Sequence, residues 1–134
     1  MKLMKKIVVL LSFLALVGCA TLSTVRDAAQ SAGISKEFNS DIELTKSYVL
    51  TSMVGLNINI VKTLENEHGF NILFSKDPEH YHKGEVGRVL VYEKGGTTIV
   101  AVHSRPRDLL STYLTTEQDF ADAIFSGLKE LIRR

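Results

Sequence analysis

Two alternate histidines, His80 and His82, are the first residues whose types and spacing suggest chemistry. On an extended segment their side chains would point the same way, with Asp77 and Glu79 nearby. Two imidazoles and a carboxylate are ligands that zinc or copper accepts. However, no third histidine or cysteine stands at ligand spacing, and a polar connection of this kind is typical of a solvated loop. We therefore expect no cofactor here, with metal or small-ligand binding by this loop as the alternative.

His103, Ser104 and Asp108 supply the residue types of a hydrolase triad. Neighbours on a strand point to opposite faces, however, and no glycine-flanked nucleophile turn surrounds Ser104. The glycines of 84–87 and 95–96 also lack the strand-to-helix context and the lysine of a phosphate-binding loop. The sequence therefore predicts a protein that is not an enzyme.

Three arginines, Arg88, Arg105 and Arg107, lie toward one end of a predicted hairpin, and the first two belong to the same predicted face. Such a group could receive an anionic partner, either a lipid A phosphate or a protein carboxylate. The competing interpretation, which we favour, is a solubilising edge that discourages aggregation between strands.

The beginning of the chain combines basic residues with a short apolar segment. Lys2, Lys5 and Lys6 precede residues 7–17, which are apolar except for Ser12. This segment is about half the roughly 20 residues that a spanning helix needs. A basic start followed by a short apolar run is typical of a signal peptide.

The residues Leu16-Val17-Gly18-Cys19 resemble the lipobox of bacterial lipoproteins. The resemblance implies cleavage between Gly18 and Cys19 and acylation of Cys19, for example by palmitate, with two or three chains giving stable attachment to a membrane. Ala20 stands where an aspartate would imply inner-membrane retention, so the resemblance implies the outer membrane, facing the periplasm. The competing interpretation is an ordinary secretory signal with a buried cysteine.

Cleavage before Cys19 would leave 116 of the 134 residues, enough for one small domain. Without the three lysines of the signal, 13 Lys and Arg oppose 15 Asp and Glu, a formal charge of −2. This charge does not favour nucleic-acid binding. Cys19 is the single cysteine, so we expect no disulfide and a fold stabilised by packing.

Residues 20–36 are small and polar, and their few apolar side chains are too sparse to hold a helix alone. We therefore expect three regions: a signal peptide over 1–18, a lipidated tether over 19–36 and a single domain over 37–134.

The pattern of apolar residues predicts the elements of that domain. Alternation over 41–45 predicts a strand with Ile42 and Leu44 on one face. Ser47 is a candidate N-cap for a helix that ends at His68-Gly69. The apolar residues of this predicted helix recur at helical spacing: Val49, Met53, Leu56, Ile60 and Leu64.

Strand alternation returns with Phe70, Ile72 and Phe74, and the segments 86–93 and 97–104 form a hairpin across Gly95-Gly96. The last element is a helix from Glu117 to Arg134, with Thr115 or Thr116 in a capping box. Its apolar stripe consists of Phe120, Ile124, Leu128 and Leu131. The order β-α-β-β-β-α predicts an α+β fold, a single antiparallel-rich sheet backed by two helices.

This order resembles the helix-grip-like domains of some small envelope lipoproteins, including accessory lipoproteins of the outer-membrane β-barrel assembly machinery. The resemblance covers roughly residues 40–134 and is carried by segments 64–72 and 117–134. The anchor, together with the absence of convergent catalytic groups in the sequence, predicts a non-enzymatic, membrane-anchored lipoprotein that binds or scaffolds another envelope component. The sequence leaves that partner and the oligomeric state open.

The predicted hairpin is apolar on both faces, although two helices on one side of a sheet cover one face. One face carries Val89, Val91, Val100 and Val102, which pair across the hairpin. The other carries Leu90, Tyr92, Ile99 and Ala101, with Arg88 and His103 at its far end. The face without helices would be covered by the tether, by residues 108–114, or by a partner protein.

Overall fold

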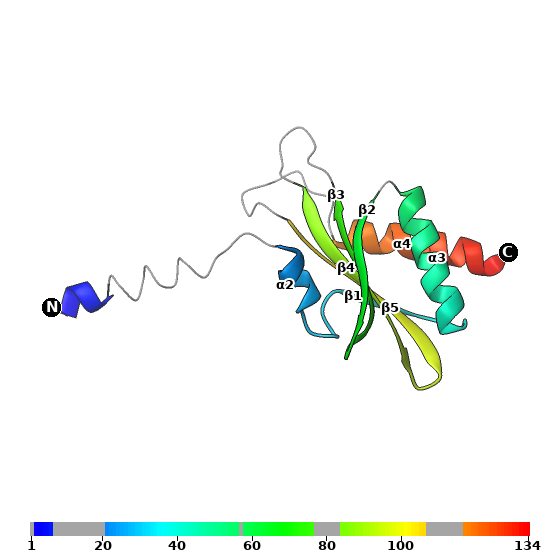
Figure 1. Ribbon diagram of the computed structural model, residues 1–134, viewed down its shortest axis with the longest axis horizontal. Coiled ribbons are helices and arrows are strands. Elements are labelled where there is room, and N and C mark those ends of the chain that lie inside the picture. The colour runs from blue at the N-terminus through cyan, green and yellow to red at the C-terminus, as the bar shows by residue number, and fades with distance from the viewer. Residues whose placement is uncertain (1, 7–20, 57, 77–83, 107–116) are drawn as a thin grey trace.

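The computed structural model describes residues 2–6, 21–56, 58–76, 84–106 and 117–134 (Figure 1). Residues 2–6 are helical. The elements that follow are α2 (Leu22–Arg26), β1 (Ile34–Phe38), α3 (Ile42–Gly55), β2 (Asn59–Asn66), β3 (Gly69–Lys76), β4 (Glu85–Lys94), β5 (Thr97–Pro106) and α4 (Glu117–Arg133). The five strands form one antiparallel sheet in the order β1-β5-β4-β3-β2.

The first strand and the first long helix lie earlier in the chain than the sequence pattern predicts. Residues 41–45 are not a strand, because Asp41 is the N-cap of α3 and its carboxylate accepts a hydrogen bond from the Leu44 amide at 3.1 Å. This hydrogen bond satisfies a backbone N–H at the start of the helix. It therefore stabilises a helix over the short strand that the alternation of Ile42 and Leu44 predicts. The first strand is instead β1, which pairs with β5 from Ile34 to Phe38.

The predicted helix over 47–68 is divided between α3 and β2. Helix α3 ends at Gly55, and β2 pairs with β3 from Asn59 onward. The spacing of Ile60 and Leu64 fits one face of a helix. In β2, a β-bulge between Ile60 and Lys62 shifts the register, so that these two side chains lie on opposite faces of the sheet. The β-branched residues of 58–63 favour the strand.

His68-Gly69 lies in the β2–β3 hairpin and is not a helix end, because His68 is in the turn and Gly69 begins β3. Asn66 pairs with Gly69 across the turn, and the Asn66 side-chain oxygen accepts a hydrogen bond from the His68 amide at 2.9 Å. Gly69 has φ +135°, and a Cβ there would lie 2.7 Å from the Val91 carbonyl oxygen. The hairpin therefore requires glycine at position 69. A glycine is also typical of a helix C-terminus, which is why the sequence pattern predicts a helix end here.

The remaining elements are confirmed. β3 contains the predicted strand of Phe70, Ile72 and Phe74, and β4 and β5 form a hairpin across Gly95-Gly96. Its register pairs Val91 with Val100 and Val89 with Val102, as the sequence predicts. Helix α4 begins at Glu117. The candidate capping residues Thr115 and Thr116 lie outside the described residues.

Helices α3 and α4 cover one face of the sheet, where the main apolar core lies (Figure 1). The paired valines of the hairpin are buried there with Ile72 and Phe74 of β3. Phe74 packs against Phe120 of α4 with ring centroids 5.5 Å apart, and Phe38 of β1 packs against Phe125 at 5.9 Å. The sheet backed by two helices is therefore confirmed as the α+β core of the fold.

A third layer lies on the opposite face of the sheet. There Val25 of α2 is buried with Leu73 and Val86, and Leu22 and Leu64 pack against them. Helix α2 and β1 thus belong to the packed domain, although the sequence assigns residues 19–36 to a tether. The correction has a physical reason, since a five-residue helix too weak to form alone is stabilised by the sheet beneath it.

Candidate functional site

The sheet face proposed for a partner protein is largely covered by the chain itself. Leu90, Ile99 and Ala101 are buried, and Tyr92 is half-buried. Helix α2 contacts β3, β4 and β5 on this side of the sheet. Of the three coverings that the sequence leaves open, the structure shows the expected tether in this role, and the three buried side chains are not available to a partner in this arrangement.

Arg88 holds the segment that follows α2, residues 27–33, against the sheet. Its side chain is fully buried, and its guanidinium donates to the carbonyl oxygens of Ala28 at 2.7 Å, Ala29 at 2.9 Å and Arg26 at 3.3 Å. Burial lowers the pKa of Arg88. Within the described part of the chain, no salt bridge joins Arg88 to a carboxylate, so backbone dipoles of the 27–33 segment and of Arg26 solvate this charge.

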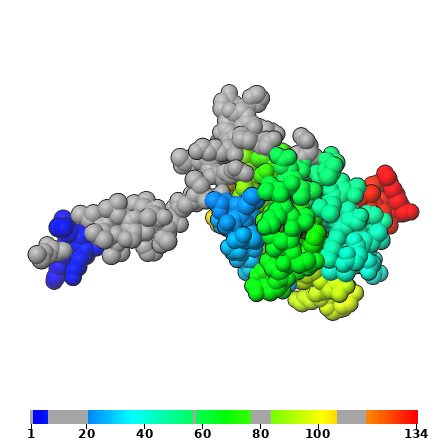
Figure 2. All heavy atoms as spheres, viewed as in Figure 1, coloured from blue at the N-terminus to red at the C-terminus, as the bar shows by residue number. Residues whose placement is uncertain are grey.

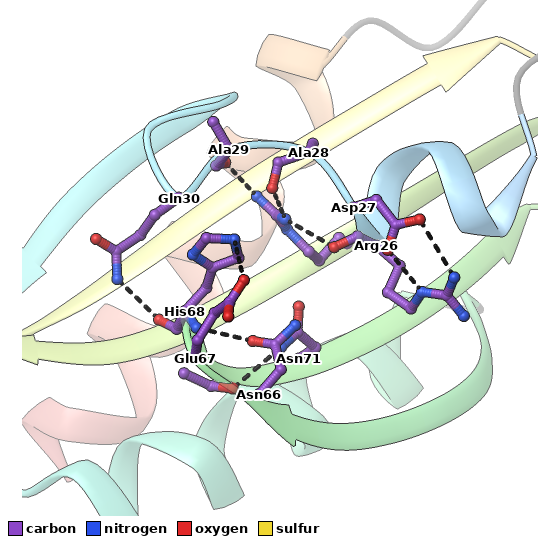
Figure 3. A network of polar contacts seen from close by, with 11 residues as sticks. Arg26, Asp27, Ala28, Ala29, Gln30, Asn66, Glu67, His68 and Asn71 are labelled. Atoms are coloured by element: carbon purple, nitrogen blue, oxygen red, sulfur yellow. Dashed lines mark hydrogen bonds and ion pairs between the residues drawn. The ribbon is translucent and has the colours of Figure 1, made fainter.

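A second set of hydrogen bonds ties the same segment to the β2–β3 turn. The Gln30 amide donates to the His68 carbonyl oxygen at 2.8 Å (Figure 3). Inside the turn, the buried Asn71 side chain donates to the Asn66 side-chain oxygen and to the Gly69 carbonyl oxygen, both at 3.0 Å. The turn that receives Gln30 is therefore itself fixed by side-chain hydrogen bonds.

The three arginines do not gather in the described structure. The β4–β5 register places Arg88 and Arg105 on the same face, as predicted, but Arg88 is buried and Arg105 is exposed. Arg107 lies outside the described residues. Arg88 is therefore occupied within the fold, and the interpretation of these arginines as one anion site finds no support in the described residues.

His103 pairs with Glu117 at the first turn of α4. The distance from His103 Nδ1 to Glu117 Oε2 is 2.9 Å, and the same oxygen accepts the backbone amide of Ser104 at 2.9 Å. The last β1 partner on β5 is Val102, so the Ser104 amide lies beyond the paired edge, and Glu117 supplies its acceptor. Ser104 contributes its amide to this contact, which stabilises the sheet edge; the predicted partner Asp108 lies outside the described residues.

The histidines of the candidate metal loop, His80 and His82, lie outside the described residues, as do Gly18 and Cys19. In the ranges that the structure describes, no group of three or more His, Cys, Asp or Glu side chains is arranged to hold a metal ion. Metal binding by His80 and His82 therefore stays a prediction from the sequence.

A small cavity lies between the end of α3 and the start of α4. Its volume is about 90 Å³, below the roughly 300 Å³ at which ligand pockets usually begin. Its lining consists of Leu56, Ile58, Lys76, Asp119, Phe120 and Ala123. The Lys76 ammonium lies 5.7 Å from the centre of the Phe120 ring. The cavity is large enough for water but small for an organic ligand.

From Ser47 onward, the exterior of α3 carries no charge, whereas Glu43 in its first turn is exposed and pairs with Lys46 at 3.0 Å. Leu44 and Val54 are 45% and 69% exposed, and Ser47 and Thr51 lie exposed between them at helical spacing. No Lys, Arg, Asp, Glu or His occurs from Ser47 to Val61. We call Leu44, Ser47, Thr51 and Val54 the α3 exterior; helix α3 lies at the surface of the molecule (Figure 2).

In the described part of the chain, no helix combines the length and the apolar character that crossing a membrane requires. A comparison of the whole chain with protein-family models finds no match, and a search of curated proteins finds no significant similarity.

Proposed function

We propose that this chain is the precursor of a bacterial lipoprotein, cleaved after Gly18 and acylated at Cys19. The lipid holds the protein on a membrane, with its domain facing the periplasm. Ala20, in place of the aspartate that implies inner-membrane retention, favours the outer membrane. The support is the basic start, the short apolar segment and the Leu16–Cys19 pattern. A thiol at this position is a soft nucleophile suited to alkylation by a lipid donor.

The domain acts without catalysis, by binding or scaffolding another envelope component. The observation that carries this role is the α3 exterior, where Leu44 and Val54 expose apolar surface and no residue of α3 after Lys46 is charged, because apolar surface without neighbouring charge favours contact with another molecule. Val49 and Met53 face the core, while Leu44 and Val54 face solvent. The partner would present an uncharged, apolar surface of its own. The two helices that cover one face of the sheet also support the resemblance to helix-grip-like domains. The order of the helices and strands along the chain, however, differs from the predicted β-α-β-β-β-α.

Metabolic labelling with palmitate tests the proposed acylation and membrane attachment. Wild type should incorporate label and remain with membranes, and Cys19→Ala should lose both properties. Recovery of unlabelled wild-type protein that still carries its first eighteen residues would refute the lipoprotein assignment.

Site-specific photocrosslinking in living cells tests the binding role. A photoreactive residue in place of Thr51, on the α3 exterior, should give a discrete heavier adduct, and Val54→Glu should abolish it because a carboxylate would be desolvated at the contact. Ser126, an exposed small residue of α4, is the matched control position and should give no such adduct. Monomer alone from both positions, under several growth conditions, would contradict a partner on this surface.

A further inference from the structure

We propose that the α2 side of the domain lies directly on the bilayer that holds the lipid anchor, and that the α3 exterior faces away from that bilayer. The inference rests on the proposed acylation of Cys19. It adds an orientation and a second contact surface, a lipid headgroup layer against α2, to the proposed function.

The first step is the length of chain between the anchor and the fold. Helix α2 begins at Leu22, three residues after Cys19. A fully extended chain spans at most about 3.6 Å per residue, so Leu22 lies within about 11 Å of the acylated residue whatever the path between them. The sequence pattern assigns an eighteen-residue tether, 19–36, to the same region, and a tether of that length would allow any orientation.

The second step is that α2 is fixed to the sheet and cannot serve as part of the tether while it stays packed. Val25 is fully buried against Leu73 and Val86. The chain leaving α2 is held by the guanidinium of Arg88, which donates to the carbonyl oxygens of Arg26 and Ala28. The short connection therefore attaches to a rigid point on the domain.

The third step is the layered arrangement of the fold. Helix α2 covers one face of the sheet, and α3 and α4 cover the other (Figure 1). A helix with its side chains is about 10–12 Å across, and a sheet adds a further layer, so the outer surface of α3 is roughly 30 Å from the outer surface of α2. A connection of about 11 Å cannot bring the α3 exterior to the same bilayer.

The chemistry of the α2 side is compatible with a headgroup layer. Its exposed side chains at the start of the helix are hydroxyls, from Thr21, Ser23 and Thr24. From residue 21 to residue 33 the sequence has one acid and one base, Asp27 and Arg26, and these pair at 2.9 Å. No unpaired carboxylate of this segment therefore opposes anionic phospholipid, and hydroxyls can hydrogen-bond to headgroups.

Depth-dependent fluorescence quenching tests the orientation in the full acylated protein. Acylation consumes the thiol of the single cysteine, so Ser23→Cys and Thr51→Cys each provide one labelling site, both at exposed positions. The labelled proteins are reconstituted in vesicles of phosphatidylethanolamine and phosphatidylglycerol that contain a headgroup-attached nitroxide quencher. The probe at residue 23 should lose most of its fluorescence, and the probe at residue 51 should keep nearly all of it.

A matched variant tests the geometric cause. Insertion of about fifteen Gly and Ser residues between Ala20 and Thr21 adds roughly 20 Å of flexible reach and should remove most of the difference between the probes. Equal quenching of both probes without the insertion, or stronger quenching at residue 51, would overturn the orientation. Mass measurement before reconstitution separates the two proposals: protein that lacks acyl chains refutes the lipoprotein assignment and the orientation together, whereas acylated protein with equal quenching refutes the orientation alone.

Discussion

The two faces of the sheet are covered by different kinds of interaction. Among the described residues, one cluster of fifteen buried apolar residues joins the sheet to α3 and α4, whereas the cluster that joins it to α2 has three, so apolar packing against helices dominates the first face. On the α2 face, the guanidinium of Arg88 and the side chain of Gln30 add hydrogen bonds to the backbone. We infer that apolar packing in the main core determines the fold. On the α2 face, the hydrogen bonds of Arg88 and Gln30 fix residues 21–33 to the sheet as a layer, and without them this segment would be a flexible tether.

The largest expected effect separates two neighbouring residues of β3. Phe74→Ala removes a ring that packs against Phe120 in the main core and should lower the free energy of unfolding by about 3–5 kcal/mol. Leu73→Ala, on the α2 face, should cost about 2 kcal/mol, the lower end of its range, because the thin layer above it can collapse. Urea unfolding measures both. Equal costs would show that the two faces are equally packed.

The next effect concerns the contact between Arg88 and the 27–33 segment. Arg88→Met fills a similar volume but leaves three carbonyl oxygens without their donor, and we expect a loss of about 1–3 kcal/mol in urea unfolding. Limited proteolysis should show faster cleavage within residues 22–33. Arg88→Lys should fall between wild type and Arg88→Met, because one ammonium replaces a planar fork of donors. Unchanged stability and unchanged cleavage in Arg88→Met would exclude a holding role for the guanidinium.

A smaller effect is expected at the edge of β5. Glu117→Gln keeps one oxygen acceptor but removes the charge that receives the Ser104 amide and the His103 ring, so we expect a loss of about 1 kcal/mol. Asp122→Asn, an exposed carboxylate on the same helix, is the control and should stay within about 0.5 kcal/mol of wild type. Chemical unfolding compares them, and identical losses would remove the special role of Glu117.

The smallest effect is expected for the ion pairs of Lys46, which lies 2.9 Å from Glu65 of β2 and 3.0 Å from Glu43. Hydrogen bonds to Glu65 and then Glu43 raise the pKa of Lys46. Lys46→Met should cost less than about 1 kcal/mol at neutral pH. Because the folded pKa is raised, the stabilisation is complete below the unfolded pKa of about 10.4 and is lost as pH rises through the folded pKa.

Unfolding curves of wild type and Lys46→Met at neutral and alkaline pH measure this difference. The two proteins should converge at alkaline pH. A gap that persists above the pKa of the lysine would assign its contribution to packing on Phe70, whose ring centre is 5.0 Å from the ammonium.

Apolar periodicity predicted the parts of the fold that depend on the main core. The stripe of α4 from Phe120 to Leu128 and the pairing of Val89 with Val102 are both observed, because each burial pattern has one dominant interpretation. The region from Asp41 to Gly69 differs from the prediction for two reasons. Ile60 and Leu64 have helical spacing, but a β-bulge between Ile60 and Lys62 places them on opposite faces of the sheet. A capping carboxylate at Asp41 also competes with a short alternation.

The α2 face could not be predicted because its signals lie far apart in the chain. Arg88 contacts carbonyl oxygens about sixty residues away, and Gln30 contacts His68. An arginine inside an apolar strand indicates that a buried hydrogen-bond acceptor is needed, but the sequence does not identify that acceptor. Glu117 is similar, since its place in the first turn of a helix does not reveal that it receives the edge of β5.

Native-state hydrogen exchange of the mature chain tests most directly whether residues 21–33 are a layer of the fold. The amides of Val25, Asp27 and Ala32 donate to backbone oxygens of Thr21, Ser23 and Ala29. We predict that these three amides exchange more slowly than an unstructured chain, and that Arg88→Met removes this protection while the strands stay protected. Exchange at the rate of a free chain in wild type, with an intact sheet, would show that the segment is a tether and would contradict both the third layer and the orientation derived from it.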